Sequence, residues 1–232
     1  SGDMRGHAMS HFIKPIFSGL DRNEFEIFVY SNYPEEKEDV VSQQIKALVT
    51  HWSNVFEKPD VECAKEINAD EIDILIDLSG HTEHERLSVF AYKPAPVQMS
   101  WMGYPGTTGM DTIDYYILDK YLAPSSKIDE QFTEKLIRLP ASAPFQPYKF
   151  SPDVRELPFI KNGYVTFGNF SRQEKINSFT IGLWRDVLHA LPSSQLLIAG
   201  LHLDQQESVR AQFQAAGVNM AQINWKVRGD IM

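Results

Sequence analysis

Residues 72–118 read IDILIDLSGHTEHERLSVFAYKPAPVQMSWMGYPGTTGMDTIDYYIL. The stretch opens with an apolar, strand-like run at 72–78, continues with a helical segment at 82–92, and ends with two short runs at 97–102 and 113–118. The short runs are rich in β-branched and aromatic residues and are bounded by Pro or Gly, which is typical of strands. Strands that alternate with helices predict an α/β fold with a mainly parallel sheet.

The same alternation extends on both sides of this stretch. Upstream, the pattern predicts a helix containing Phe12 to Phe17, a strand at 25–30, a helix at 35–49 opened by Pro34, and a helix at 60–68 capped by Asp60. Downstream, it predicts strands at 136–139, 164–167, 195–199 and 223–225 and helices at 178–191 and 204–216. Together these elements favour a doubly wound architecture.

A shift in composition divides the predicted elements into two groups. Residues 140–159 (PASAPFQPYKFSPDVRELPF) are rich in proline and lack periodicity, so we assign residues 141–162 to a stiff interdomain linker. The expected domains are 1–140 and 163–232. A doubly wound domain typically needs roughly 100 to 150 residues. The second group is shorter than that, so we expect it to be part of a domain.

Charge and cysteine content narrow the classes of partner and compartment. The formal net charge is −9, so the sequence does not predict a basic surface that would bind the phosphate backbone of a nucleic acid. The apolar runs are far shorter than the ~20 residues of a membrane-spanning helix. A single cysteine, Cys63, excludes an intramolecular disulfide and a multi-cysteine zinc site. These features predict a cytoplasmic protein that does not bind nucleic acid.

Ligands of open parallel sheets bind beyond the carboxyl ends of the strands, so polar residues near those ends are candidates. The glycine-containing turn before the first predicted helix carries His7, and His11 follows four residues later on the expected same face. A helix N-terminus disfavours the imidazolium cation, which makes His7 a candidate general base. The alternative is that His7 is a capping or surface residue.

Two further candidate sites follow strands of the first domain. Directly after the run at 72–78, Gly80 permits a sharp turn that can direct His81 and Thr82 into a crevice; alternatively, Thr82 caps a helix. The loop WMGYPGTTG at 101–109 combines glycines with hydroxyl groups and is suited to a sugar, a phosphate or a peptide. It is not a Walker A loop, and a purely structural turn is the competing interpretation.

The fourth candidate site lies in the second domain. The segment FGNFSRQEKI at 167–176 runs from a strand end into a helix that carries Lys175. A cationic side chain at this position can neutralise a nucleotide diphosphate leaving group. For the neighbouring Arg172, Gln173 and Glu174, a solvated charged turn is the simpler interpretation.

Several of these blocks together resemble a known enzyme family. The segments GDMRGHAMSHF, DILIDLSGHT, KPAPVQMSWMGYPGTTGMDTIDYYILD, EKLIRLP and FGNFSRQEKI occur in this order and are similar to the catalytic region of the O-linked N-acetylglucosamine transferase family. That family includes bacterial homologues and Spindly-type O-fucosyltransferases. The resemblance extends from Gly2 to about Trp225, and its most distinctive block is PAPVQMSWMGYPGTTG.

The resemblance implies a GT-B-like fold with two Rossmann-like domains. It also implies transfer of a sugar, with inversion, from a nucleotide-sugar to Ser or Thr of a polypeptide. The leading candidates are N-acetylglucosamine as the sugar and UDP-GlcNAc as the donor. The nucleotide-sugar is then a co-substrate, with no metal or other cofactor, and tetratricopeptide repeats are expected upstream. Family members have a strand before the position of Ser1 and a donor-binding segment beyond that of Met232. We therefore expect a truncated fragment that is inactive in isolation.

The resemblance also assigns roles to individual residues. His7 takes the position of a histidine near the reaction centre, and Lys175 that of a lysine that steadies the donor diphosphate. The implied substrate- and donor-binding positions are His81, Thr82, Tyr104, Pro105, Gly106, Thr107, Thr108 and Asn169. Arg172 departs from the Gln or Asn of several members, which argues against a donor contact there.

Three alternatives stay open at this point. A substrate-assisted or water-relayed proton transfer can replace His7 as the base. The chain can belong to a non-catalytic peptide-binding or scaffold module of the same fold. It can also belong to a transferase of another sugar, such as fucose, or of glucose to Asn.

Overall fold

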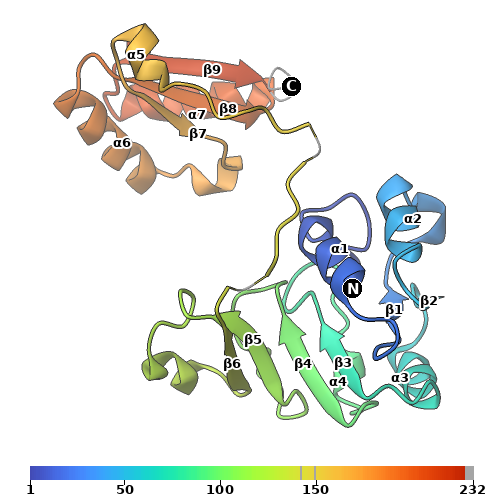
Figure 1. The fold of residues 1–232 in the computed structure, drawn as a ribbon. Coiled ribbons are helices and arrows are strands. Elements are labelled where there is room, and N and C mark those ends of the chain that lie inside the picture. Colours follow the sequence, from blue (N-terminus) through green and yellow to red (C-terminus); the bar gives the residue numbers. More distant parts are fainter. Residues whose placement is uncertain (142, 149, 228–232) are drawn as a thin grey trace. The chain divides into compact units, whose positions relative to one another are not determined.

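The computed structural model describes residues 1–141, 143–148 and 150–227 (Figure 1). The chain forms two compact units, Ser1–Ser151 and Pro152–Met232. Every strand pair in both units is parallel. The predicted α/β class with parallel sheets is therefore confirmed.

The first unit contains a two-stranded sheet, β1-β2, and a four-stranded sheet, β3-β4-β5-β6. Its elements are α1 Ser10–Gly19, β1 Phe28–Ser31, η1 Glu35–Lys37, α2 Val40–Lys46, β2 His51–Asn54, α3 Asp60–Ala69, β3 Ile74–Asp77, α4 Leu87–Phe90, β4 Val97–Trp101, β5 Tyr115–Asp119, η2 Ser126–Gln131 and β6 Lys135–Leu139.

Two apolar clusters form the main core of this unit. In the first, Leu75 of β3 packs with Ile67 of α3 and Phe90 of α4. In the second, α1 and α2 pack against Val29 of β1, and Ile45 of α2 is fully buried. Since successive strand residues point to opposite faces, β1 and β3 each direct alternate side chains, such as Val29 and Leu75, toward these clusters.

The predicted helix at 35–49 is wrong, because the backbone breaks within it. Asp39 has an extended conformation and begins a new helix, α2, as its N-cap. Its carboxylate accepts from the N–H groups of Val41 and Ser42, both at 2.9 Å, and Ser42 Oγ accepts in return from the Asp39 N–H at 3.2 Å. This capping box favours a helix start at a position where the periodicity predicts continuation.

The predicted helix at 82–92 shortens to the single turn of α4. His84 has a φ of 61°, which does not fit a right-handed helix. Arg86, at the N-cap of α4, donates hydrogen bonds to the carbonyl oxygens of Val55 and Lys58 and pairs with Asp60 at 2.8 Å. These tertiary contacts place Arg86 outside a continuous helix.

One other expectation about the first unit is wrong, and one strand forms where none was predicted. Helix α1 begins at Ser10, so His7 precedes the helix and does not share a helical face with His11. Strand β2 was not predicted, because HWSN at 51–54 carries no apolar alternation. Its strand conformation depends on parallel pairing with β1, in which Phe28 lies opposite His51.

The second unit has one three-stranded sheet, β7-β8-β9. Its elements are α5 Pro158–Asn162, β7 Thr166–Asn169, η3 Gln173–Lys175, α6 Ser178–Ala190, β8 Gln195–Leu201, α7 Leu203–Ala215, η4 Met220–Gln222 and β9 Ile223–Val227. Its core joins Ile198 of β8 to Ile181 of α6 and Phe213 of α7, each of them buried. Helix α5 lies inside the segment 141–162 that the composition assigns to the linker.

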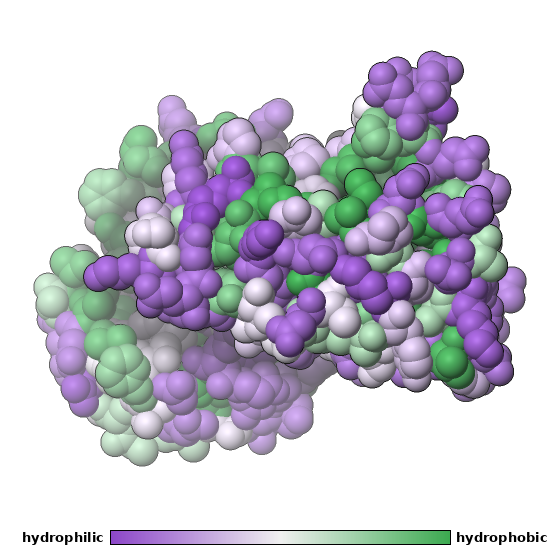
Figure 2. All heavy atoms as spheres, turned by 90° about the horizontal axis from the view of Figure 1, so that it is seen from below, coloured by the Kyte–Doolittle hydropathy of each residue, from purple (hydrophilic) through white to green (hydrophobic). Residues whose placement is uncertain are grey.

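Apolar and hydrophilic side chains are intermingled on the molecular face shown in Figure 2. Across the described ranges, none of the helices has both the length and the apolar character that crossing a bilayer requires.

Candidate functional site

The turn that follows β3 is organised by a buried carboxylate. Asp77, the last residue of β3, is only 5% exposed. It accepts hydrogen bonds from the N–H groups of Ser79 at 3.0 Å and Gly80 at 2.8 Å, and from the hydroxyl of Ser100 at 2.8 Å. Asp77 therefore joins the turn after β3 to the carboxyl end of β4 and fixes the direction of the residues that follow.

Two glycines let this turn contact the loop after β4. Gly80 has a φ of +55°, and a Cβ atom there would lie 2.7 Å from Cβ of Tyr104. A Cβ atom on Gly103 would lie 2.5 Å from Cα of Ser79 and closer still to its carbonyl group. Real Cβ atoms do not approach backbone so closely, so the two loops meet only because both positions are glycine.

The contact between these loops brings several predicted site residues together. His81 Nε2 lies 3.1 Å from the carbonyl oxygen of Thr107, and its ring meets the ring of Tyr104 edge-on at 5.5 Å. Thr82 donates its hydroxyl to the carbonyl oxygen of Ser79 at 2.9 Å. Because α4 begins at Leu87, Thr82 does not cap a helix, and that alternative is wrong.

The two threonines of the loop are anchored by a residue that the sequence did not single out. Glu134 is 4% exposed and accepts hydrogen bonds from Thr107 Oγ1 at 2.8 Å, from the N–H of Thr108 at 2.7 Å and from Thr108 Oγ1. The predicted binding hydroxyls therefore hold the loop in place. An acidic residue directly before an apolar strand, here β6, is the only signal in the sequence, and it is a weak one.

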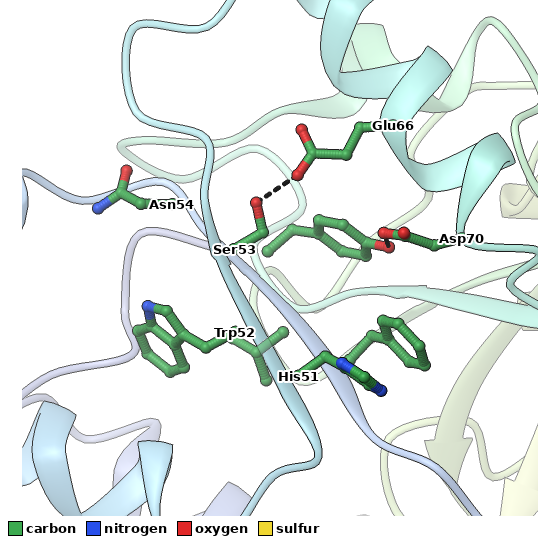
Figure 3. Close-up of a pocket in the computed structure, with 9 residues that line it drawn as sticks. His51, Trp52, Ser53, Asn54, Glu66 and Asp70 are labelled. Atoms are coloured by element: carbon green, nitrogen blue, oxygen red, sulfur yellow. Dashed lines mark hydrogen bonds between the residues drawn. The ribbon is translucent and has the colours of Figure 1, made fainter.

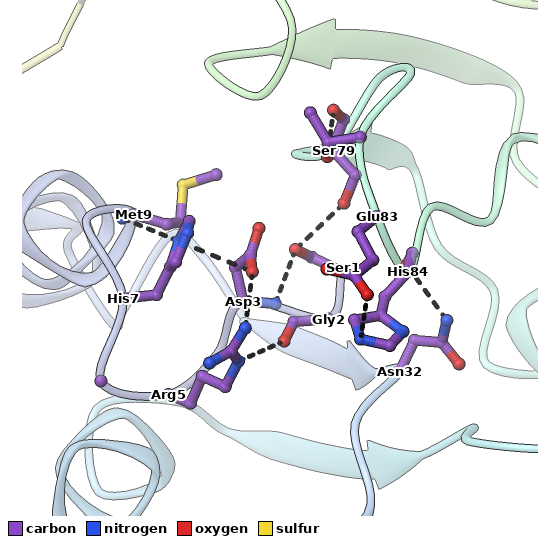
Figure 4. A network of polar contacts seen from close by, with 12 residues as sticks. Ser1, Gly2, Asp3, Arg5, His7, Met9, Asn32, Ser79, Glu83 and His84 are labelled. Atoms are coloured by element: carbon purple, nitrogen blue, oxygen red, sulfur yellow. Dashed lines mark hydrogen bonds and ion pairs between the residues drawn. The ribbon is translucent and has the colours of Figure 1, made fainter. Parts of the chain in front are cut away.

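A second loop, residues 1–9, lies beside the ends of β1 and β3 (Figure 4). The carbonyl oxygen of Ser1 accepts from the N–H of Asn32 at 2.9 Å, and Ser79 donates its hydroxyl to Ser1 Oγ at 3.2 Å. Asp39 also holds this loop, since its Oδ2 accepts from the N–H of Gly6 at 2.7 Å. No pattern in the sequence indicates that Asp39 links α2 to the loop that carries His7.

His7 is partly accessible, and its ring is held on one side. Its side chain is 44% exposed, and Nδ1 lies 3.5 Å from Oδ1 of Asp3. The N–H of Met9 donates to the same nitrogen at 3.3 Å. When Nδ1 accepts this bond, the neutral ring carries its proton on Nε2. In that tautomer His7 presents a hydrogen-bond donor to a ligand, whereas a base acting through Nε2 requires Nδ1–H to face Asp3.

Asp39 provides a test of how α2 and the His7 loop are held. Burial raises the pKa of its carboxyl, but the N–H groups of Ser42, Gly6 and Val41 outweigh burial and lower the pKa below its ordinary value. A carboxyl whose pKa is lower in the folded state stabilises the fold above its unfolded pKa, and this stabilisation is lost as the pH falls through the folded pKa.

We therefore expect Asp39→Ala to lower the free energy of unfolding by about 1 kcal/mol at neutral pH. The difference from the unchanged protein should shrink as the pH falls below the ordinary aspartate pKa of about 3.9. Urea unfolding at neutral pH and at a pH below this value measures the difference in unfolding free energy. Asp111→Ala is the matched control, because Asp111 is an exposed aspartate of the same unit. An equal loss at both pH values would contradict the proposed role of the carboxylate.

The remaining predicted site residues belong to the second unit. Asn169 ends β7 and accepts from the N–H of Ser171 at 3.1 Å. It also lines a pocket of about 270 Å³ together with Phe167 and Trp184. Lys175 ends η3 and is exposed, and among the described residues its ammonium group has no hydrogen-bond or ion-pair partner. Asn169 thus lies at the carboxyl end of β7, and Lys175 follows that end in the chain.

The first unit contains a pocket of about 450 Å³, which lies over β1, β2 and α3 (Figure 3). The ring of Phe28 stacks on His51 at 4.1 Å, and the hydroxyl of Tyr30 donates to Asp70 at 2.6 Å. Burial, and then the bond to Asp70, raises the pKa of Tyr30. The described residues form no cluster of three or more His, Cys, Asp or Glu suited to a metal ion.

Comparison with known proteins gives a consistent result. The sequence profile described as glycosyl transferase family 41 matches residues 1–145. The probable UDP-N-acetylglucosamine–peptide N-acetylglucosaminyltransferase SPINDLY of Oryza sativa subsp. japonica is 34% identical over 203 residues, covering 85% of this chain and 22% of the relative. The protein SEC of Arabidopsis thaliana, which carries the same enzyme description, is 29% identical over 233 residues, covering 96% of this chain and 24% of the relative.

A solved structure also matches nearly the whole chain. An O-GlcNAc transferase mutant of Thermobaculum terrenum superposes with a TM-score of 0.88 at 32% sequence identity, covering 98% of this chain and 43% of that chain. The present chain thus spans less than half the length of each of these proteins.

Proposed function

Because this chain belongs to glycosyl transferase family 41, we propose that the natural protein containing it transfers N-acetylglucosamine from UDP-GlcNAc to Ser or Thr hydroxyls of polypeptides. The observation that carries the proposal is the match over 98% of the chain to an O-GlcNAc transferase structure. The same match confirms the predicted GT-B-like α/β fold. The names of the plant relatives, which describe peptide N-acetylglucosaminyltransferases, support the choice of donor and acceptor.

The proposed reaction is a single displacement at the anomeric carbon. The acceptor hydroxyl oxygen forms a bond to this carbon while the bond from the carbon to the diphosphate oxygen breaks, so the configuration inverts. The hydroxyl proton leaves to a base, and the diphosphate leaves with the electron pair of the broken bond. The protein must therefore orient the hydroxyl and stabilise negative charge on the leaving group.

The site residues of the first unit suit the orienting task. His81, Tyr104 and Thr107 are held together by the contact between the two loops, which provides a preformed surface for a substrate. His7 offers an Nε2–H donor in the tautomer that the Met9 amide favours. We propose that His7 holds a substrate oxygen and that water or the substrate itself accepts the hydroxyl proton.

Lys175 is proposed to act on the leaving group. Its exposed ammonium group has no partner among the described residues, so the charge is available to a diphosphate. Asn169 is proposed to contact the donor from the end of β7. A cytoplasmic location, supported by the single, unpaired Cys63, and upstream tetratricopeptide repeats are further parts of the proposal.

A donor comparison on the natural protein tests this function. We expect peptide-dependent release of UDP from UDP-GlcNAc and incorporation of the sugar at Ser or Thr, measured by mass spectrometry. Faster reaction with GDP-fucose, or with UDP-glucose on Asn peptides, would assign the protein to another transferase. Peptide binding without use of any of these donors would identify a scaffold module and overturn the proposal.

A further inference from the structure

Part of the proline-rich segment is bound to the start of α1. The N–H of Gln146 donates to the carbonyl oxygen of His11 at 2.7 Å, and His11 Nδ1 lies 2.8 Å from the carbonyl oxygen of Gln146. A carbonyl oxygen only accepts, so Nδ1 carries the proton in this pair. Two reciprocal hydrogen bonds therefore join residues that lie 135 positions apart in the sequence.

Aromatic contacts surround these hydrogen bonds. The ring of His11 lies 4.2 Å from the ring of Tyr148 and 5.6 Å from that of Phe145, while Phe12 lies 5.4 Å from Phe145. Phe145 and Tyr148 remain 56% and 69% exposed, so the segment lies on the surface of the first unit and not in its core. The ring of His11 thus contacts the aromatic side chains on both sides of Gln146 and Pro147.

The sequence of the segment suits this attachment. Pro144 and Pro147 restrict the backbone and lack an N–H group. A residue before proline favours an extended conformation, which applies to Gln146. The segment therefore presents its main-chain donor and acceptor at Gln146 with little loss of conformational freedom.

The same turn of α1 also holds the loop of the candidate site. The N–H of Ser10 donates to the carbonyl oxygen of His7 at 3.0 Å, and its hydroxyl donates to the same oxygen at 2.8 Å. The N–H of His11 donates to the carbonyl oxygen of Ala8 at 3.2 Å. His11 thus directly follows Ser10, whose N–H and hydroxyl hold the carbonyl oxygen of His7.

We propose that His11 is a positioning residue that clamps residues 145–148 to α1. Through the clamp, this part of the proline-rich segment moves with the first unit, and the first turn of α1 keeps the His7 loop in one conformation. The inference goes beyond the proposed function, because the clamp acts whichever sugar or acceptor the site takes.

Amide hydrogen exchange on the 232-residue chain tests the clamp at Gln146. In His11→Ala we expect the Gln146 amide to exchange about five- to tenfold faster, which is the factor that corresponds to loss of about one net hydrogen bond. The amides of β3 to β6 should keep their protection. His11→Phe retains a ring but no donor, and His11→Asn retains a donor but no ring; each should give an intermediate rate.

His51→Ala is the matched control, because His51 is also a partly exposed histidine stacked on a phenylalanine. It should leave the exchange of Gln146 unchanged. The double variant Phe145→Ala, Tyr148→Ala disturbs the clamp without altering α1 and should reproduce the effect of His11→Ala. Unchanged exchange of Gln146 in both clamp variants would overturn the proposal.

The link to His7 has its own measurement. Imidazole resonances of His7 in NMR spectra should shift or broaden in His11→Ala and in the double variant, but not in His51→Ala. Faster exchange of Gln146 with unaltered His7 resonances would overturn the positioning role. Neither result depends on sugar transfer, so failure of this inference is distinguishable from failure of the proposed function.

Discussion

Replacing Lys175 by alanine is expected to lower the turnover of the natural protein about 100-fold or more, the size of effect seen when one group that stabilises developing charge is removed. The leaving diphosphate gains negative charge as the bond to the sugar breaks, and a nearby ammonium group lowers the energy of that state. Because Lys175 is exposed and unpaired among the described residues, its removal should hardly change the stability of the fold.

The measurement is a steady-state assay of UDP release, with thermal unfolding of the same samples. Lys161→Ala is the matched control, since Lys161 is also an exposed lysine near the end of a short helix of the second unit. The control should retain full turnover. Wild-type turnover in Lys175→Ala would remove this residue from the mechanism, and a large loss of thermal stability would assign it a structural role.

The second large effect is expected from Gly103→Ala. The new Cβ atom would lie 2.5 Å from Cα of Ser79, and that neighbour is backbone, which cannot rotate away as a flexible side chain can. The turn after β3 and the loop after β4 must therefore separate. We expect the free energy of unfolding to fall by about 2 to 4 kcal/mol, which is in the range of steric overpacking and backbone strain.

Urea unfolding measures this loss, and Gly19→Ala is the matched control. A Cβ atom on Gly19 would meet nothing within 4 Å, so the same substitution there should be neutral or slightly stabilising. In Gly103→Ala the edge-on contact between His81 and Tyr104 should also be lost, visible as changed His81 resonances in NMR spectra. Equal stability of the two variants would show that the loops are not in close contact.

Both predictions concern residues that the sequence marks, but for different reasons. Lys175 stands out because it is a cationic residue that follows a predicted strand, and the family resemblance assigns it a role. The glycines at 80 and 103 stand out only as turn formers. The contacts of Gly80 with Tyr104 and of Gly103 with Ser79 appear in the structure alone, because a close approach of two loops leaves no periodicity in the sequence.

Sequence patterns identified few of the residues that hold the candidate site in place. Asp77, Asp39 and Glu134 each accept several hydrogen bonds from turns or loops. Each of them also has a partner far away in the chain, namely Ser100 for Asp77, Gly6 for Asp39 and Thr107 for Glu134, and such a pairing leaves no characteristic spacing in the sequence. Periodicity and composition therefore detect the substrate-facing candidates more readily than the groups that position them.

The sequence by itself determined the α/β class, the parallel sheets and most strand positions, because alternation of apolar residues and turn formers is a local property. Runs such as 72–78 and 113–118 form strands because alternate side chains, such as Leu75 and Tyr116, are buried on one face of the sheet. The family resemblance, which the comparisons confirm, rests likewise on the local order of residues in blocks such as PAPVQMSWMGYPGTTG.

Only the tertiary structure decided where helices break, that β2 forms, and which polar groups hold the candidate site. Asp39 and Arg86 interrupt predicted helices because their hydrogen bonds, to a new helix start and to distant carbonyl groups, outweigh local helical preference. The attachment of Gln146 to His11 belongs to the same class. The bonds of Arg86 to Val55 and of His11 to Gln146 join residues 31 and 135 positions apart, so their energies act only after the chain has folded.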